Sequence, residues 1–142
     1  MAYEEKTKWA YFLASPVINL FYIWIVLSRA GDGPLTEVAY GWTMFWAVLI
    51  TIGLMILSAI LFNILSPQDS DKADERDKSI ERYGEYIGHI IFSILMMGVL
   101  IMTVHGYDHF WIAHAIFFAC FLATMIGTAV KLVAYRRGFR QW

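Results

Sequence analysis

Residues Tyr40 to Leu65 read YGWTMFWAVLITIGLMILSAILFNIL and contain no charged side chain. The hydrocarbon core of a bilayer is about 30 Å thick, and a helix needs about 20 apolar residues to cross it. A helix also satisfies all of its backbone hydrogen-bonding groups internally, which lipid demands. This stretch therefore predicts a membrane-spanning helix, and it decides the fold class of the chain.

Three further stretches have the same apolar character: Trp9–Leu27, Tyr86–Val104 and Phe110–Ala134. Of the 142 residues, 59% are hydrophobic and only 16% are charged, which is not the balance of a soluble globular protein. The connections between the stretches are short, so consecutive helices are expected to be antiparallel. The predicted fold is all-α: an integral membrane four-helix up-down bundle, with residues 1–142 forming a single membrane domain.

The positions of the lysines and arginines predict how these helices cross the membrane. Ten of the eleven basic residues lie before the first span, between the second and third spans, or at the end of the fourth, and only Arg29 lies on the other side. Cytoplasmic flanks of membrane spans are enriched in Lys and Arg. We therefore expect the N-terminus, the C-terminus and the middle connection to lie in the cytoplasm.

The connection between the second and third spans is rich in charges of both signs. Asp71 can cap a helix, and opposite charges recur three or four residues apart, as at Asp74 and Lys78. The third helix is therefore expected to begin near Asp71 and to extend into the cytoplasm as a stalk over residues 71–85. A solvated, salt-bridged helix explains this pattern most simply. The alternative is a cytoplasmic docking surface, whose candidate residues are Asp74, Glu75, Arg76, Asp77 and Arg82.

Several short motifs in the C-terminal half suggest a family. They are Asp74-Glu75-Arg76-Asp77, Tyr86-Ile87-Gly88, Phe110-Trp111-Ile112-Ala113 and Tyr135-Arg136-Arg137-Gly138-Phe139. Together they resemble an uncharacterised family of small bacterial inner-membrane proteins, filed as a domain of unknown function. The resemblance implies a location in the bacterial plasma membrane and four helices, and it implies no catalytic residue.

Ionisable residues inside a membrane span are costly and are therefore candidate functional residues. Glu85 and His89 lie four apart on one face of the third helix, where the carboxylate can orient the imidazole ring. Asn63 and Lys131 are expected at the same cytoplasmic depth on the second and fourth helices. The four residues predict an intramembrane polar cluster, either as interhelical hydrogen bonds that hold the bundle together or as a proton or cation pathway. A metal or haem ligand role for His89 is a further alternative.

A second group of polar residues surrounds the outer turn between the third and fourth spans. His105, Asp108, His109 and His114 lie within ten residues of one another. Imidazole and carboxylate groups can bind zinc, copper or iron, and a histidine can also coordinate haem. The spacing fits no strong metal motif, so interfacial, water-exposed residues are the simpler interpretation. The candidate cofactors are thus haem or a transition metal, and the sequence establishes neither.

Small residues recur every four positions along the fourth helix, with two more on the third helix. Because lipid gives helices little hydrophobic reason to associate, small residues that let two backbones approach closely promote packing. The predicted helix-packing seam comprises Ala115, Ala119, Ala123, Gly127, Gly84 and Gly88. Packing within one bundle is favoured for part of this seam, and packing between chains is the alternative.

The composition excludes several classes of function. The single cysteine, Cys120, excludes an internal disulfide framework and multi-cysteine metal sites, and the net charge of −1 does not suggest a nucleic-acid-binding protein. No nucleophile has a recognisable base and oxyanion stabiliser, so we expect no enzymatic activity.

The leading hypothesis is a non-enzymatic membrane protein that contacts membrane lipids and is a self-assembling homo-oligomer or an accessory or scaffold subunit of a larger membrane complex. The alternatives are a histidine-based metal or haem protein with a redox or sensing role, and a small oligomeric proton or cation transporter or channel.

Overall fold

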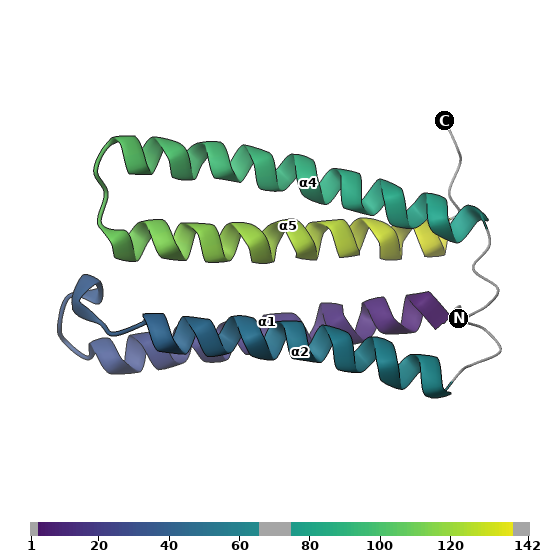
Figure 1. Cartoon of the computed structure of the whole chain (residues 1–142), viewed down its shortest axis with the longest axis horizontal. Coiled ribbons are helices and arrows are strands. Elements are labelled where there is room, and N and C mark those ends of the chain that lie inside the picture. The colour runs from purple at the N-terminus through teal and green to yellow at the C-terminus, as the bar shows by residue number, and fades with distance from the viewer. Residues whose placement is uncertain (1–2, 66–74, 138–142) are drawn as a thin grey trace. The chain divides into compact units, whose positions relative to one another are not determined.

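The computed structural model describes residues 3–65 and 75–137, and it does not describe the side chains of residues 3–7, 62, 63, 65, 75, 76 and 137 within those ranges. The described residues form four long α-helices, one short 3-10 helix and no strand. The long helices are α1 (Tyr3–Ala30), α2 (Gly41–Leu65), α4 (Glu75–Val104) and α5 (His109–Arg137). The all-helical prediction is confirmed for this part of the chain (Figure 1).

All four long helices contain a segment that is long and apolar enough to cross a membrane. These segments are Lys8–Ala30, Gly41–Leu61, Asp77–Val104 and His109–Arg136. Each of the four apolar stretches expected from the sequence lies within one helix, except that Tyr40 immediately precedes α2. Four candidate membrane spans, the central prediction, are therefore confirmed by length and composition.

The chain divides into two compact units, Met1–Lys72 and Ala73–Trp142, which are described separately. In the first, α1 and α2 pack together as a hairpin, and the 3-10 helix η1 (Leu35–Glu37) lies in the connection. The turn after α1 begins at Gly31, whose φ of +52° is a conformation that favours glycine. Arg29 secures the connection, because its Nη1 donates to Ala39 O at 3.2 Å and to Thr43 Oγ1 at 2.7 Å.

One face of α1 is buried and partly polar. Ser15, Asn19, Tyr22 and Val26 occur at the spacing of a single helix face, and each is buried. Pro16 lies within this helix and has no N–H to donate to the preceding turn. Asn19 Nδ2 donates to Ser15 O at 2.9 Å, which adds a side-chain hydrogen bond within the turn that contains Pro16.

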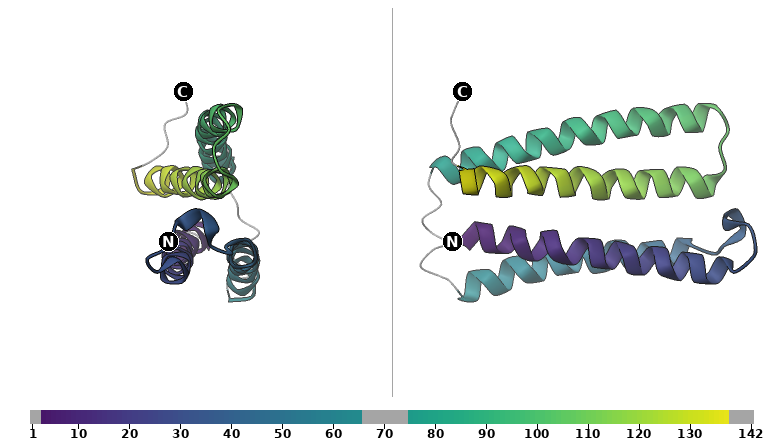
Figure 2. Two further views of the ribbon diagram at one scale, coloured as in Figure 1. Left: turned by 90° about the vertical axis from the view of Figure 1, so that its left-hand side faces the viewer. Right: turned by 180° about the vertical axis from the view of Figure 1, so that it is seen from behind.

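The second unit is a hairpin of α4 and α5, which run antiparallel and side by side in all three views (Figures 1 and 2). Gly106, with a φ of +70°, reverses the chain between the two helices. Asp108 then caps α5, because its Oδ1 accepts from Phe110 N at 2.8 Å and its backbone carbonyl accepts from Trp111 N at 3.0 Å. The tight turn fixes how residues of α4 and α5 face one another along the hairpin.

Candidate functional site

Three glycines bring α4 and α5 into backbone contact. A Cβ atom on Gly127 would lie 2.9 Å from Gly84 O and 3.5 Å from Gly88 Cα, and a Cβ atom on Gly88 would lie 3.2 Å from Ala123 O. The 2.9 Å and 3.2 Å separations to backbone oxygens are shorter than ordinary Cβ contacts, so a larger side chain at either glycine would force the two backbones apart. The glycines therefore set the distance of closest approach between the two helices, in the manner of a small-residue contact between membrane helices.

Most residues of the predicted seam lie at or near this glycine contact. Ala119 and Ala123 are buried, Ala115 is half-buried, and Gly84 and Gly127 are buried where the helices cross. Of the small residues beside the seam, Cys120 and Thr124 are exposed, whereas Thr128 is buried. The glycine part of the seam thus packs within one chain, between α4 and α5.

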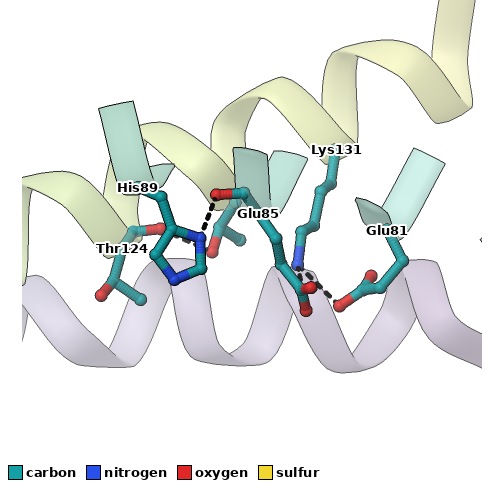
Figure 3. Close-up of polar contacts among 6 residues, drawn as sticks. Glu81, Glu85, His89, Thr124 and Lys131 are labelled. Carbon is teal, nitrogen blue, oxygen red and sulfur yellow. Dashed lines mark hydrogen bonds and ion pairs between the residues drawn. The ribbon is translucent and has the colours of Figure 1, made fainter. Parts of the chain in front are cut away.

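Lys131 lies directly over this glycine contact. Its side chain passes across Gly84, where a Cβ atom would meet Lys131 Cγ and Cε. Lys131 Nζ then reaches Glu81 Oε1 at 2.6 Å and comes within 3.8 Å of Glu85 Oε1. Figure 3 shows the lysine extending from α5 toward both carboxylates of α4. We call Glu81, Glu85 and Lys131 the charge cluster.

The three members of the charge cluster differ in burial. The Lys131 side chain is 11% exposed and the Glu81 side chain 30%, whereas the Glu85 side chain is 56% exposed. An ion pair in water contributes about 0–1 kcal/mol, and removing one partner from a buried pair costs about 3–5 kcal/mol. The free energy lost on removing one partner of the Lys131–Glu81 pair is expected to lie between these values, because the pair is largely, but not fully, removed from solvent. The shorter and more buried of the two contacts, Lys131 with Glu81, is therefore expected to contribute more to the stability of the α4–α5 hairpin.

The predicted intramembrane polar cluster is only partly assembled. Lys131 and Glu85 do come together, but His89 does not bind the Glu85 carboxylate as expected. Its Nδ1 lies 2.9 Å from the backbone carbonyl of Glu85, and since a carbonyl only accepts, Nδ1 carries the proton. The expectation that the carboxylate orients the ring is therefore wrong, because the carbonyl one turn earlier on the same helix is the nearer acceptor. The side chain of Asn63 lies outside the described residues.

Sequence reasoning missed Glu81, which lies within the predicted stalk of residues 71–85. The signal that identifies it is the position of the turn. Glu81 and Lys131 each lie 25 residues from Gly106, so in an antiparallel hairpin they reach the same depth. Counting outward from the reversal would have selected Glu81 over Glu85 as the partner of Lys131.

The four polar residues around the outer turn do not form a metal site in the structure. His105 Nδ1 hydrogen-bonds to Ile101 O at 2.8 Å, and His114 Nδ1 hydrogen-bonds to Phe110 O at 2.7 Å. The Asp108 carboxylate caps α5. His114 is buried with its ring centroid 4.0 Å from that of Phe110, whereas His109 is exposed. Among the residues that the structure describes, no three His, Cys, Asp or Glu side chains are grouped so that they could hold a metal ion.

The predicted stalk residues are only partly described. Asp74 lies outside the described residues, and for Glu75 and Arg76 the structure describes the helical backbone alone. Asp77 is half-buried and Arg82 is exposed, both in the first turns of α4. The docking surface, the alternative interpretation of these five residues, stays a prediction.

Comparison of the chain with protein-family models, with curated proteins and with solved structures gives no match.

Proposed function

We propose that this chain is a multi-pass protein of the bacterial plasma membrane that acts as a non-enzymatic, self-assembling or accessory subunit of a membrane complex. Four helices that are long and apolar enough to span a bilayer support the membrane location. The motifs that resemble small bacterial inner-membrane proteins support the compartment. Within the proposed function, the protein supplies binding surfaces to other membrane subunits.

The proposed topology is an up-down-up-down bundle with both termini in the cytoplasm. Ten of the eleven lysines and arginines lie on the sequence segments that this topology leaves in the cytoplasm. The first turns of α4 then extend beyond the bilayer into the cytoplasm, where the exposed side chains of Lys78 and Arg82 contact water. Arg29 and the turn at Gly106 lie on the outer side.

The proposed role is supported by the division between helix faces that pack within the chain and helix faces that remain exposed. The glycine seam packs between α4 and α5 of one chain, so a subunit contact has to use the outer faces of the helices. Those faces are extensive and apolar: Trp42, Phe45 and Trp46 of α2 are 71%, 47% and 49% exposed, and their rings contact one another. Aromatic residues of this kind are favoured at membrane interfaces and at protein contacts.

The mass of the protein in its own membrane tests this proposal. The chain, with a small affinity tag on a terminus, is extracted directly into lipid nanodiscs and measured by native mass spectrometry. We expect a homo-oligomer or a stoichiometric assembly with a second membrane protein. A monomer of 16.4 kDa plus tag as the sole species, at native expression and in mild extraction, would overturn the proposed role.

A further inference from the structure

Four polar side chains occur in sequence along one exposed side of α4. Arg82, Glu85, His89 and Ser93 are all exposed, and Glu85 keeps 56% of its side chain accessible. At 100° per residue, they lie within an arc of about 80° of the helix. Their spacing of three, four and four is the spacing at which one helix face contacts a neighbouring helix. We call these residues the polar flank.

The polar flank is distinct from the other two sides of α4. The side that packs against α5 carries Ile80, Gly84 and Val99, which are buried. The remaining side is apolar and exposed, with Ile94 and Ile101 65% and 57% accessible. Acyl chains can cover an apolar side of this kind, but they offer no hydrogen-bond partner to a carboxylate, an imidazole or a guanidinium.

Local hydrogen bonds leave complementary groups directed outward from the flank. His89 donates its Nδ1–H to Glu85 O, and Ser93 Oγ donates to His89 O at 2.8 Å. Nε2 of His89 is then the ring atom left for a further hydrogen bond, and Figure 3 shows this ring next to Glu85 along the helix. Ser93 Oγ–H can supply that bond by rotating away from its own helix. Arg82 and Glu85 add one charge of each sign.

We propose that the polar flank is the contact surface of a parallel, two-fold symmetric dimer of this chain. Arg82 of one copy pairs with Glu85 of the partner subunit, and Ser93 of one copy hydrogen-bonds His89 of the partner subunit. A two-fold interface is isologous, so each pair forms twice. If all charges on the flank had one sign, two copies would repel each other. This flank instead carries Arg82 and Glu85, of opposite charge, three residues apart at one end. At the other end it carries His89 and Ser93, which can hydrogen-bond each other across the interface, four residues apart.

This inference rests on the proposed function, since it names one surface and one partner for the assembly of the subunit. It also accounts for His89 and Ser93, exposed polar residues C-terminal to the predicted stalk, on a span whose other exposed side is apolar. In a membrane, such groups favour contact with protein over contact with lipid. A second copy is the occupant that carries the matching groups at the same depth, because both copies insert in the same orientation.

Disulfide cross-linking in native membranes tests the proposed surface. Cys120 is the single cysteine of the chain and is changed to alanine, and Ser93→Cys is then compared with the matched variant Ile94→Cys. Both positions are exposed on α4 at nearly the same depth, but they lie about 100° apart around the helix. A disulfide requires Cα atoms within about 7 Å, so we expect Ser93→Cys to form a covalent dimer about tenfold faster than Ile94→Cys.

A charge reversal provides a second, independent readout in the Ser93→Cys background. Arg82→Glu places two carboxylates opposite each other and should lower the cross-linking rate about tenfold, and adding Glu85→Arg should restore it. Arg136→Glu, which makes the same change of charge at an exposed site of α5, should leave the rate unaltered.

Three outcomes would overturn the inference, and they differ in what they mean for the proposed function. Cross-linking that is equal or faster at Ile94→Cys, with a dimer mass in nanodiscs, would reject the polar flank and leave the proposed function intact. A cross-linked band at the mass of a different protein would reject a second copy as the occupant and would still support an accessory subunit. Absence of cross-linking at both positions, with a monomer mass in nanodiscs, would reject both proposals.

Discussion

Lys131 Nζ lies 2.6 Å from Glu81 Oε1, although the two residues are 50 positions apart in the sequence. The contact is possible because the lysine side chain crosses α4 at Gly84, where no Cβ atom obstructs it. The glycine thus has two effects: it lets the α5 backbone approach α4, and it lets the lysine extend to the next turn. Packing and electrostatics are therefore coupled at one position of the hairpin.

Replacing Lys131 by methionine should destabilise the second hairpin by about 1–3 kcal/mol. The expected loss is smaller than the 3–5 kcal/mol of a fully buried pair because Glu81 retains 30% side-chain exposure and can recruit water. The measurement is the free energy of unfolding in mixed detergent micelles, titrated with SDS and followed by tryptophan fluorescence.

The double variant Lys131→Met with Glu81→Gln should recover most of that loss, because it leaves no uncompensated charge. Glu85→Gln alone serves as the matched control. Its carboxylate is 3.8 Å from the lysine and 56% exposed, so we expect a change below about 0.5 kcal/mol. Equal losses for Glu81→Gln and Glu85→Gln would show that the two carboxylates contribute alike, contrary to the geometry.

Gly84→Ala should also destabilise the hairpin, by about 1–3 kcal/mol, for a steric reason. The added methyl group would displace the Lys131 side chain, and it would also lie 2.9 Å from Gly127 O, a backbone atom that cannot move aside without separating the helices. Gly98→Ala is the control, since a Cβ atom there meets nothing within 4 Å. That control should be neutral or up to about 1 kcal/mol more stable, because alanine is the better helix former. Similar destabilisation by both substitutions would indicate a general effect of helix composition instead of the close contact at Gly84.

The sequence was sufficient to predict the helices and their apolar character, because both follow from local properties. A run such as Tyr40–Leu65 satisfies its own backbone and meets the length requirement of a bilayer without reference to any other part of the chain. The seam was also foreseeable, since a repeat of small residues every four positions has few uses in lipid other than close helix contact.

The detailed contacts of the charge cluster were not predicted, because they depend on register. Glu81 and Glu85 are one helical turn apart and both suit a lysine, so composition alone does not choose between them. The Asp108 cap and Gly106 turn fix the register, and this selects Glu81. The imidazole of His89 was assigned to the wrong acceptor for a related reason. Residue spacing brings both the carboxylate and the backbone carbonyl of Glu85 within reach of the ring, and the carbonyl is the acceptor that Nδ1 contacts.

Arg29 is expected to stabilise the connection between α1 and α2. Its Nη1 donates to Ala39 O and Thr43 Oγ1, which joins the last turn of α1 to the residues at the start of α2. Because the side chain is exposed, Arg29→Ala should cost only about 1 kcal/mol of stability, but it should loosen the connection. Limited proteolysis of the loop around Thr36 in detergent should become several-fold faster, and Thr43→Val should give part of that increase by removing one acceptor. An unchanged cleavage rate in Arg29→Ala would contradict a stabilising role for these bonds.

The proposed topology predicts which side of the membrane each connection faces. In a Cys120→Ala background, Thr36→Cys places a thiol in the connection between α1 and α2, and Ser70→Cys places one in the sequence between α2 and α4. Neither change alters a charge, so the distribution of lysines and arginines that directs insertion is preserved. A membrane-impermeant maleimide should label Thr36→Cys in right-side-out vesicles and Ser70→Cys only in inside-out vesicles. Labelling of both thiols from one side would mean that α2 does not cross the bilayer, and the reversed pattern would place the termini outside and show that the ten-to-one division of basic residues does not orient this protein.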